Sequence, residues 1–102
     1  MSIKKQYIKD KSQCKVTFRL NKKSAGQAKK AYLAADFNAW QAEQTPMKPL
    51  KNGDFTVTVV LSKGREYQYR YVLDGQTWVT DEDADKHVPA GIADVQNAVV
   101  VV

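Results

Sequence analysis

Residues 55–73 read Phe-Thr-Val-Thr-Val-Val-Leu-Ser-Lys-Gly-Arg-Glu-Tyr-Gln-Tyr-Arg-Tyr-Val-Leu and contain the clearest structural pattern in the chain. Apolar side chains at 55, 57, 59 and 61 alternate with Thr56 and Thr58, and those at 67, 69, 71 and 73, three of them tyrosines, alternate with Gln68 and Arg70. A period of two residues is typical of β-strands with one buried face. The Ser62-Lys63-Gly64 turn between the two segments therefore predicts an antiparallel hairpin whose tyrosines face a core.

Similar patterns occur on both sides of this hairpin. Residues 14–20 alternate apolar and polar side chains, residues 31–35 form a short apolar run, and residues 97–102 are rich in valine. A second turn signal, Asp74-Gly75, precedes a short strand predicted over residues 78–80. Short strands with turn signals about every ten residues predict an all-β fold, an immunoglobulin-like antiparallel β-sandwich of about seven short strands.

The segments between these strands lack a strand pattern. Residues 21–30 are rich in lysine and predict an exposed loop, and residues 81–93 predict an acidic loop. Residues 36–50 contain turn formers and two prolines, so we expect an irregular segment with one helical turn around residues 40–44.

The length and the charge distribution predict one domain with a basic start. A chain of 102 residues has room for a single hydrophobic core. Residues 1–30 hold ten Lys or Arg and one acid, whereas residues 31–102 hold six basic and ten acidic residues. We expect residues 1–12 to be a frayed basic lead-in and residues 13–102 to form the β-sandwich. The basic residues are mostly lysines without interleaved aromatics, which argues against nucleic-acid binding.

The location is predicted from what the sequence lacks. No apolar run reaches the roughly 18 residues of a membrane span, and no apolar core follows the early lysines as in a secretory signal. The single cysteine, Cys14, excludes an internal disulfide and fits a small buried hydrophobe on its strand. We therefore expect a cytoplasmic protein without membrane contact.

The titratable residues do not form a recognisable catalytic pattern. Asp36, Asp74 and Asp81 occupy turn positions, where capping the backbone is the usual role of aspartate. Glycosidases need two carboxylates across a cleft, and a histidine-based triad needs a nucleophile beside the single histidine, His87. We expect no enzymatic activity and no cofactor.

A calcium loop is the metal site that the sequence most resembles. Asp81, Asp83 and Asp85 give the alternating start of such a loop. The sixth position, however, is Lys86 rather than glycine, and the twelfth is Ile92 rather than glutamate. The sequence therefore predicts a solvated acidic loop and no metal.

The two tryptophans are the strongest candidates for binding. Trp40 follows an Asp-Phe-Asn turn after one strand, and Trp78 follows the Asp74-Gly75 turn after another. A tryptophan offers a flat apolar surface to the C–H face of a sugar, and polar neighbours such as Arg70 and Gln96 would fix its orientation. Composition alone leaves a second interpretation open, in which both tryptophans anchor the core.

These motifs, taken in order, resemble those of carbohydrate-binding module family 48. The resemblance runs from residue 16 to residue 102. The members of that family include isoamylase-type N-terminal domains and the glycogen-binding domain of the AMP-activated protein kinase beta subunit. It is carried by the following positions: residues 31–40, Met47, residues 64–75, Trp78, Asp81 and Asn97.

The resemblance implies a sandwich that binds α-1,4-linked glucans such as glycogen, starch and maltooligosaccharides without hydrolysing them. Trp40 and Trp78 match the two tryptophans that stack on the sugar, and Thr77 is a one-residue insertion before the second. Ala35 replaces a glycine, which implies a backbone without positive φ at that position. The resemblance further implies that Arg70 is the basic residue of the site and that Gln96 takes a ligand position.

The same resemblance supplies an alternative function. Many members precede a glycoside hydrolase family 13 barrel and act as packing partners without a sugar site. Because this chain begins with Met and ends at its last predicted strand, we expect a freestanding module. The alternative is then a structural or interaction module that docks onto a separate partner, for example a glucan-metabolising enzyme. It predicts that Trp40 and Trp78 do not converge on one open surface.

Overall fold

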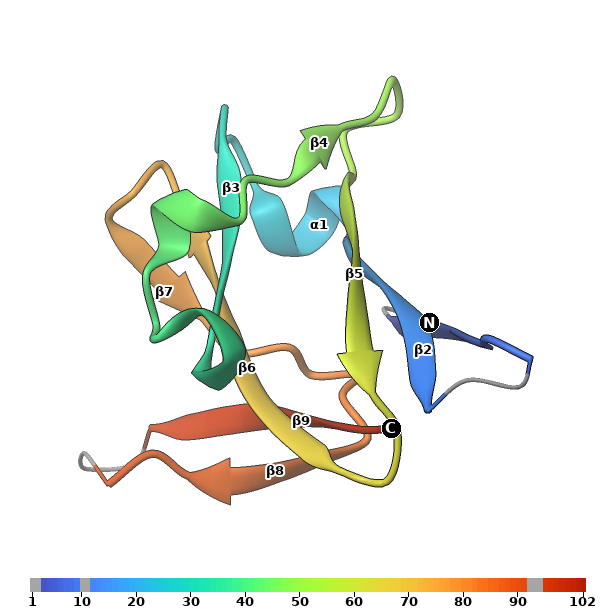
Figure 1. Ribbon diagram of the computed structural model, residues 1–102. Helices are drawn as coiled ribbons and strands as arrows, with labels where there is room; N and C mark the ends of the chain where they lie inside the picture. Colours follow the sequence, from blue (N-terminus) through green and yellow to red (C-terminus); the bar gives the residue numbers. More distant parts are fainter. Residues whose placement is uncertain (1–2, 10–11, 92–94) are drawn as a thin grey trace.

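The computed structural model describes residues 3–9, 12–91 and 95–102, which fold into two antiparallel β-sheets packed face to face (Figure 1). The four-stranded sheet has the order β1-β2-β5-β4, and the five-stranded sheet has the order β3-β6-β9-β8 with β7 also paired to β6. The strands are β1 (Ile3–Tyr7), β2 (Gln13–Leu20), β3 (Ala31–Ala35), β4 (Lys48–Pro49), β5 (Phe55–Ser62), β6 (Glu66–Leu73), β7 (Thr77–Val79), β8 (Lys86–Pro89) and β9 (Gln96–Val101). The predicted all-β, immunoglobulin-like antiparallel sandwich is confirmed.

The core lies between the two sheets and is built from the alternating strands. Odd-numbered tyrosines of β6 point inward, as predicted, and Tyr69 and Tyr71 are fully buried. The ring of Phe18 from β2 meets the ring of Tyr69 edge to face at 4.8 Å, so the sheets interlock at their centre. Cys14 is also fully buried, which confirms its predicted role.

A buried carboxylate closes this core at one end. Asp81 accepts hydrogen bonds from the hydroxyls of Tyr69 at 2.6 Å and Tyr71 at 3.3 Å. Burial, together with the neighbouring Tyr71 and Asp81, raises the pKa of Tyr69, so its hydroxyl remains a donor. This aspartate is therefore a structural anchor, as the sequence predicted for the turn aspartates.

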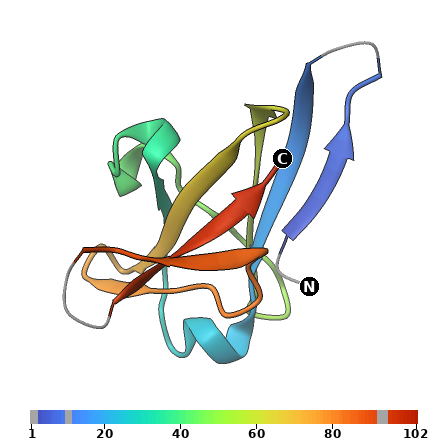
Figure 2. The same ribbon diagram turned by 90° about the horizontal axis from the view of Figure 1, so that it is seen from below.

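Three strands were not predicted from the sequence. Residues 1–12 were expected to fray, but Ile3–Tyr7 forms β1, which pairs with β2 at the outer edge of the four-stranded sheet (Figure 2). Residues 1, 2, 10 and 11 lie outside the described part of this segment. The prediction was wrong because an edge strand contacts one neighbour, so β1 buries Ile3 and otherwise carries polar side chains.

The other two unpredicted strands, β4 and β8, have the same explanation. β4 is two residues long and lies at the far edge of the four-stranded sheet. β8 lies in the segment expected to be an acidic loop, pairs with β9 alone, and ends at Pro89. Proline is tolerated at a sheet edge, where a backbone N–H is not needed. Residues 92–93 of the expected acidic loop lie outside the described residues.

Short helices occupy the connections. The segment 21–30, expected to be a loop, contains the one-turn helix α1 (Lys22–Ala25), whose first turn is capped by the Asn21 side chain accepting from the Ser24 N–H at 2.8 Å. Two 3₁₀ turns, η1 (Asp36–Asn38) and η2 (Ala42–Gln44), follow β3. The second agrees with the helical turn expected around residues 40–44.

The outer face of the five-stranded sheet carries a row of apolar side chains. Strand register places Tyr32 of β3 directly opposite Val72 of β6, and Val72 directly opposite Trp78 of β7. Directly paired residues in antiparallel strands point to the same face of a sheet. A row of three apolar side chains therefore lies on the face turned away from the core, where Val72 is buried between the half-buried Tyr32 and the exposed Trp78.

Candidate functional site

A network of hydrogen bonds made by Asn38 shapes the segment that carries Trp40. The Asn38 side chain accepts from the Ala35 N–H at 3.0 Å and donates to the Leu33 carbonyl at 2.9 Å. It also donates to the Thr45 hydroxyl at 3.0 Å. Asn38 thus ties the end of β3 to the chain that returns beneath it, and fixes the loop between them.

The backbone at Trp40 is strained. Ala39 has φ 57° and Trp40 has φ 61°, two consecutive residues with side chains in the left-handed region. This region costs roughly 1–2 kcal/mol for a residue that is not glycine, and such strain often accompanies functional sites. Ala35, in contrast, is extended with φ −153°, which confirms the expectation from its replacement of glycine. The Trp40 N–H donates to the Ala35 carbonyl at 2.8 Å and holds the strained turn closed.

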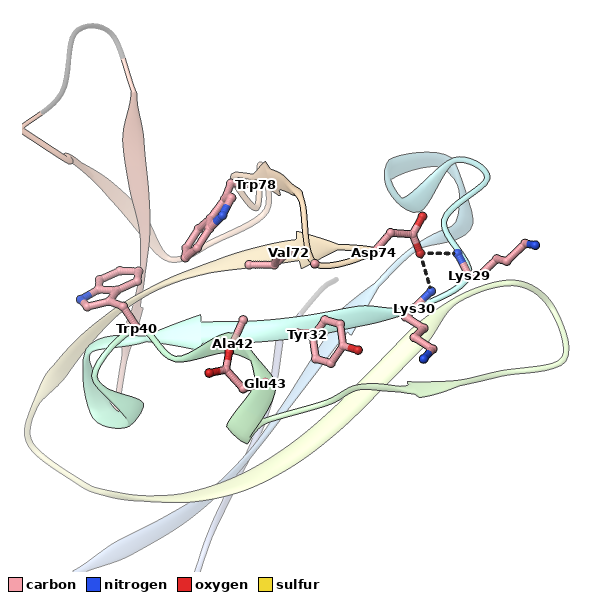
Figure 3. Close-up of a pocket in the computed structure, with 10 residues that line it drawn as sticks. Lys29, Lys30, Tyr32, Trp40, Ala42, Glu43, Val72, Asp74 and Trp78 are labelled. Atoms are coloured by element: carbon pink, nitrogen blue, oxygen red, sulfur yellow. Dashed lines mark hydrogen bonds between the residues drawn. The ribbon is translucent and has the colours of Figure 1, made fainter.

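A tight hairpin delivers Trp78 to the same face. Asp74 and Gly75 have φ 51° and 72°, the left-handed pair typical of short hairpin turns. The Asp74 carboxylate also accepts the N–H groups of Lys29 at 2.9 Å and Lys30 at 3.0 Å, which ties the hairpin to the start of β3 (Figure 3). Thr77, the apparent insertion, pairs with Leu73, so the ladder absorbs it.

The two tryptophans lie near one another on this face (Figure 3). Each of them lines the same two hollows. We call the first, of about 510 Å³, the Tyr32 hollow, and the second, of about 610 Å³, the Arg70 hollow. The Tyr32 hollow is lined by Lys29, Lys30, Tyr32, Trp40, Ala42, Glu43, Val72, Asp74, Gly75 and Trp78. The Arg70 hollow is lined by Trp40, Gln68, Arg70, Trp78, Ala90 and Asn97. The tryptophan pair therefore divides one groove into two wings.

Arg70 lies against Trp78. Its guanidinium carbon is 5.6 Å from the centroid of the Trp78 ring, within the range of a cation–π contact, and its Nη2 donates to the Trp78 carbonyl at 3.3 Å. Its Nε is buried and has no hydrogen-bond partner among the described residues. Burial lowers the pKa of Arg70, although an arginine starts so high that it remains charged. The contact fixes both side chains at the floor of the Arg70 hollow.

The structure brings together three of the four predicted site residues. Trp40, Trp78 and Arg70 share one groove, whereas Gln96 is exposed at the start of β9 and does not line either hollow. Its backbone carbonyl accepts from the Thr80 hydroxyl at 2.7 Å. The neighbouring Asn97 lines the Arg70 hollow instead.

Sequence reasoning missed several groove residues. The Asn97 amide donates to the Gln68 side-chain oxygen at 3.0 Å, so the two amides hold each other in place beside Arg70. Tyr32 and Val72 were not proposed either. The available signal was the two-residue period of β6, which places Gln68 and Val72 on the face of Arg70.

His87 and the aspartates of the calcium-like segment make hydrogen bonds within the fold. The His87 ring Nε2 lies 2.6 Å from the Asp81 carbonyl oxygen, and the Asp83 N–H donates to the Asp81 carboxylate at 3.0 Å. Within residues 3–9, 12–91 and 95–102, no three His, Cys, Asp or Glu side chains cluster as metal ligands would. In the same residues, every helix is too short or too polar to cross a membrane.

Comparison with known proteins identifies the family. A search of curated proteins finds no match to this chain. A family model described as the glycogen recognition site of AMP-activated protein kinase matches residues 15–102, nearly the whole chain. This match confirms the resemblance to glycogen-binding modules that the sequence motifs indicated. The chain belongs to the family of the AMP-activated protein kinase glycogen recognition site.

Proposed function

We propose that this chain is a non-catalytic module that binds α-1,4-linked glucans in the groove formed by Trp40, Trp78 and Arg70. The observation that carries the proposal is the convergence of both tryptophans on one open groove. A sugar presents C–H groups on a ring face and hydroxyls at its rim, so it matches flat apolar rings flanked by polar side chains. Membership of a glycogen recognition family supports the same ligand class.

Arg70 and the neighbouring amides supply the polar side of the site. The guanidinium of Arg70 is held on the Trp78 ring, and the Gln68 and Asn97 amides are held to each other. Groups fixed before the ligand arrives lose little freedom on binding, which favours affinity. The exposed Gln96 stands one residue before Asn97, and a ligand contact there stays a prediction.

The groove favours binding over hydrolysis. The carboxylates that line it belong to Glu43 and Asp74, and the Asp74 carboxylate already accepts two backbone N–H groups. Glycoside hydrolysis requires two carboxyl groups that act together on the scissile bond. Glu43 alone does not supply that pair.

The alternative function, docking onto a protein partner without sugar binding, predicted tryptophans that do not converge. The shared groove therefore favours the glucan-binding proposal. A glucan-metabolising enzyme is the partner that such a module would bring to its substrate, and a cytoplasmic location fits that role. Both stay predictions of this proposal.

Tryptophan fluorescence offers a direct test. The chain has two tryptophans, and both line the groove, so selective excitation of tryptophan reports on the site alone. Titration with maltoheptaose should change the emission with an affinity between micromolar and millimolar, about −4 to −8 kcal/mol. Glycogen should compete with maltoheptaose, whereas cellohexaose, an unbranched but β-1,4-linked glucan, should not.

Variants identify the side chains responsible. Trp40→Ala should weaken binding measured by calorimetry by about 2 kcal/mol, roughly 30-fold, because it removes an aromatic anchor. The matched control is Tyr7→Ala, since Tyr7 is 51% exposed on β1 of the other sheet. If wild type does not bind maltoheptaose, or if Trp40→Ala binds as wild type does, the proposal fails and the docking function replaces it.

A further inference from the structure

The Tyr32 hollow extends the groove away from Arg70. In Figure 3 its residues follow one another from the two tryptophans, past Ala42 and Val72, to Tyr32 and the turn at Asp74. Its volume of about 510 Å³ is similar to the 610 Å³ of the Arg70 hollow. The known motifs of the chain place the tryptophans and Arg70 in the site, but they do not account for this second wing.

The floor of the Tyr32 hollow is apolar and continuous. Tyr32, Val72 and Trp78 are directly opposite one another on three adjacent strands, so their side chains form one row on the solvent side of the sheet. None of the three belongs to the core between the sheets, although Val72 is buried beneath its neighbours. Two aromatic rings that reach solvent at either end of such a row, Tyr32 and Trp78, are typical of a binding surface.

The rim of the hollow offers free polar groups. The Tyr32 hydroxyl, the Glu43 carboxylate and the Lys30 ammonium make no hydrogen bond or ion pair with another described residue. Together they provide donors and acceptors around an apolar floor. This combination complements a sugar ring, which is apolar on its face and rich in hydroxyls at its edge.

The far end of the hollow is rigid. The Asp74 carboxylate accepts the N–H groups of Lys29 and Lys30, and the Asp74 N–H donates to the Lys30 carbonyl at 2.9 Å. Three hydrogen bonds therefore join the β6–β7 turn to the start of β3. A preformed wall of this kind limits the ordering cost of binding.

The two wings together form a track longer than one sugar ring. Gln68 in the Arg70 hollow and Val72 in the Tyr32 hollow lie four residues apart on β6, about 14 Å at the rise of a strand. Trp40 and Trp78 border both wings. A linear ligand that passes between the tryptophans would contact the Arg70 wing first and the Tyr32 wing when it is long enough.

We infer that the Tyr32 hollow is a second sugar subsite, through which the groove distinguishes long α-1,4-glucan chains from short ones. This inference rests on the proposed function. A trisaccharide is held by the tryptophans and Arg70, and a longer chain also covers Tyr32. Tyr32 supplies the stacking surface of the second subsite, and Glu43 and Lys30 bind hydroxyls at its rim.

The test compares maltotriose with maltoheptaose by calorimetry. Wild type should bind maltoheptaose about tenfold more tightly than maltotriose, because the longer sugar makes one additional contact with an aromatic ring. Tyr32→Thr, which keeps a strand-forming residue, should reduce this ratio to about twofold and change maltotriose affinity less than twofold. Tyr7→Thr, the matched change on the opposite sheet, should leave both affinities unchanged.

A second measurement on wild type does not depend on any variant folding. In amide NMR spectra, maltoheptaose should shift the signals of Lys30 and Tyr32, whereas maltotriose should leave them in place. Equal shifts by the two sugars, or a chain-length ratio that Tyr32→Thr does not alter, would overturn the second subsite while the glucan function stands. If neither sugar binds, the glucan function itself is overturned.

Discussion

The outer faces of the two sheets are built from different side chains. On the four-stranded sheet, the outward positions of β2 and β5 are mostly polar, with Val60 as the exposed apolar exception, and the Thr17 and Thr58 hydroxyls share a hydrogen bond of 2.8 Å. On the five-stranded sheet, the corresponding row holds Tyr32, Val72 and Trp78. A sandwich needs one buried face per sheet, so the polar face is what folding alone would favour. The row of Tyr32, Val72 and Trp78 departs from that pattern and belongs to the groove proposed to bind a glucan.

The β5–β6 turn and the loop after β3 also differ, in which residues occupy the left-handed backbone region. The turn between β5 and β6 uses Gly64 at φ 77°, where glycine adopts the left-handed region without strain. The loop after β3 places Ala39 and Trp40 in that region instead. The loop that carries Trp40 is therefore strained, whereas the turn between β5 and β6 is not.

The largest expected effect comes from removing the support of the strained loop. Asn38→Ala should lower the free energy of unfolding by about 3 kcal/mol, because it deletes three hydrogen bonds and leaves partly buried backbone groups unpaired. In thermal unfolding that corresponds to a fall in Tm of about 12–24 °C. Maltoheptaose affinity should fall with it, since Trp40 loses its fixed position.

Asn52 provides the matched control for this change. Its side chain accepts from the Asp54 N–H at 3.0 Å in an exposed turn next to the four-stranded sheet. Asn52→Ala should cost less than about 1 kcal/mol, as expected for an exposed hydrogen bond, and should not affect sugar binding. Equal losses of stability in the two variants would show that the Asn38 side chain supports its loop no more than Asn52 supports the exposed turn.

Deleting residues 1–9 should separate stability from binding. The deletion removes β1, the buried Ile3, and the hydrogen bond from the Tyr7 hydroxyl to the Val102 carbonyl at 3.0 Å. Loss of one buried isoleucine implies a destabilisation of about 2 kcal/mol, or about 8–16 °C in Tm. Because β1 belongs to the sheet opposite the groove, glucan affinity should remain within twofold of wild type. An unchanged Tm would restore the view of this segment as a frayed lead-in.

The strands that sequence patterns could reveal are the ones with two neighbours or one clean buried face. β2 and β6 alternate over most of their length because core side chains of the other sheet meet every second residue. The edge strands β1, β4 and β8 have fewer buried positions, so their sequences carry little periodic signal. Pairing with a neighbour, rather than an intrinsic pattern, makes them strands.

The site was predictable to the extent that single residues reveal it. Trp40, Trp78 and Arg70 are conspicuous by residue type or by family motif, and the structure places them together. Tyr32 was not found because its place in the groove depends on register across β3 and β6, which is a long-range property. Whether Gln96 or Asn97 reaches the groove depends on a shift of one residue along β9, which reverses the face of a side chain.

A pair of arginines tests the comparison between the two faces directly. Arg70→Ala should weaken maltoheptaose binding by about 1.4 kcal/mol, tenfold, through loss of charged hydrogen bonds to the sugar. Arg19 is the matched residue on the four-stranded sheet, where its Nε donates to the Asp54 carboxylate at 2.9 Å. Arg19→Ala should leave binding unchanged. Similar losses in both variants would indicate a general charge effect and remove Arg70 from the site.

The smallest expected effect concerns the strain beside Trp40, and its sign is opposite to the others. Ala39→Gly should relieve roughly 1–2 kcal/mol of left-handed strain but lose about 0.4–1 kcal/mol to the greater freedom of the unfolded chain. We expect a net stabilisation of about 0.5 kcal/mol in chemical denaturation.

Ala35 is the control, because it lies four residues earlier with extended backbone at φ −153° and a fully buried side chain. Ala35→Gly relieves no strain and should destabilise the protein by about 1 kcal/mol. Opposite signs at these two alanines would establish that the loop beside Trp40 is strained. If Ala39→Gly destabilises as much as Ala35→Gly, the left-handed turn is not strained in solution, and the contrast drawn with Gly64 falls.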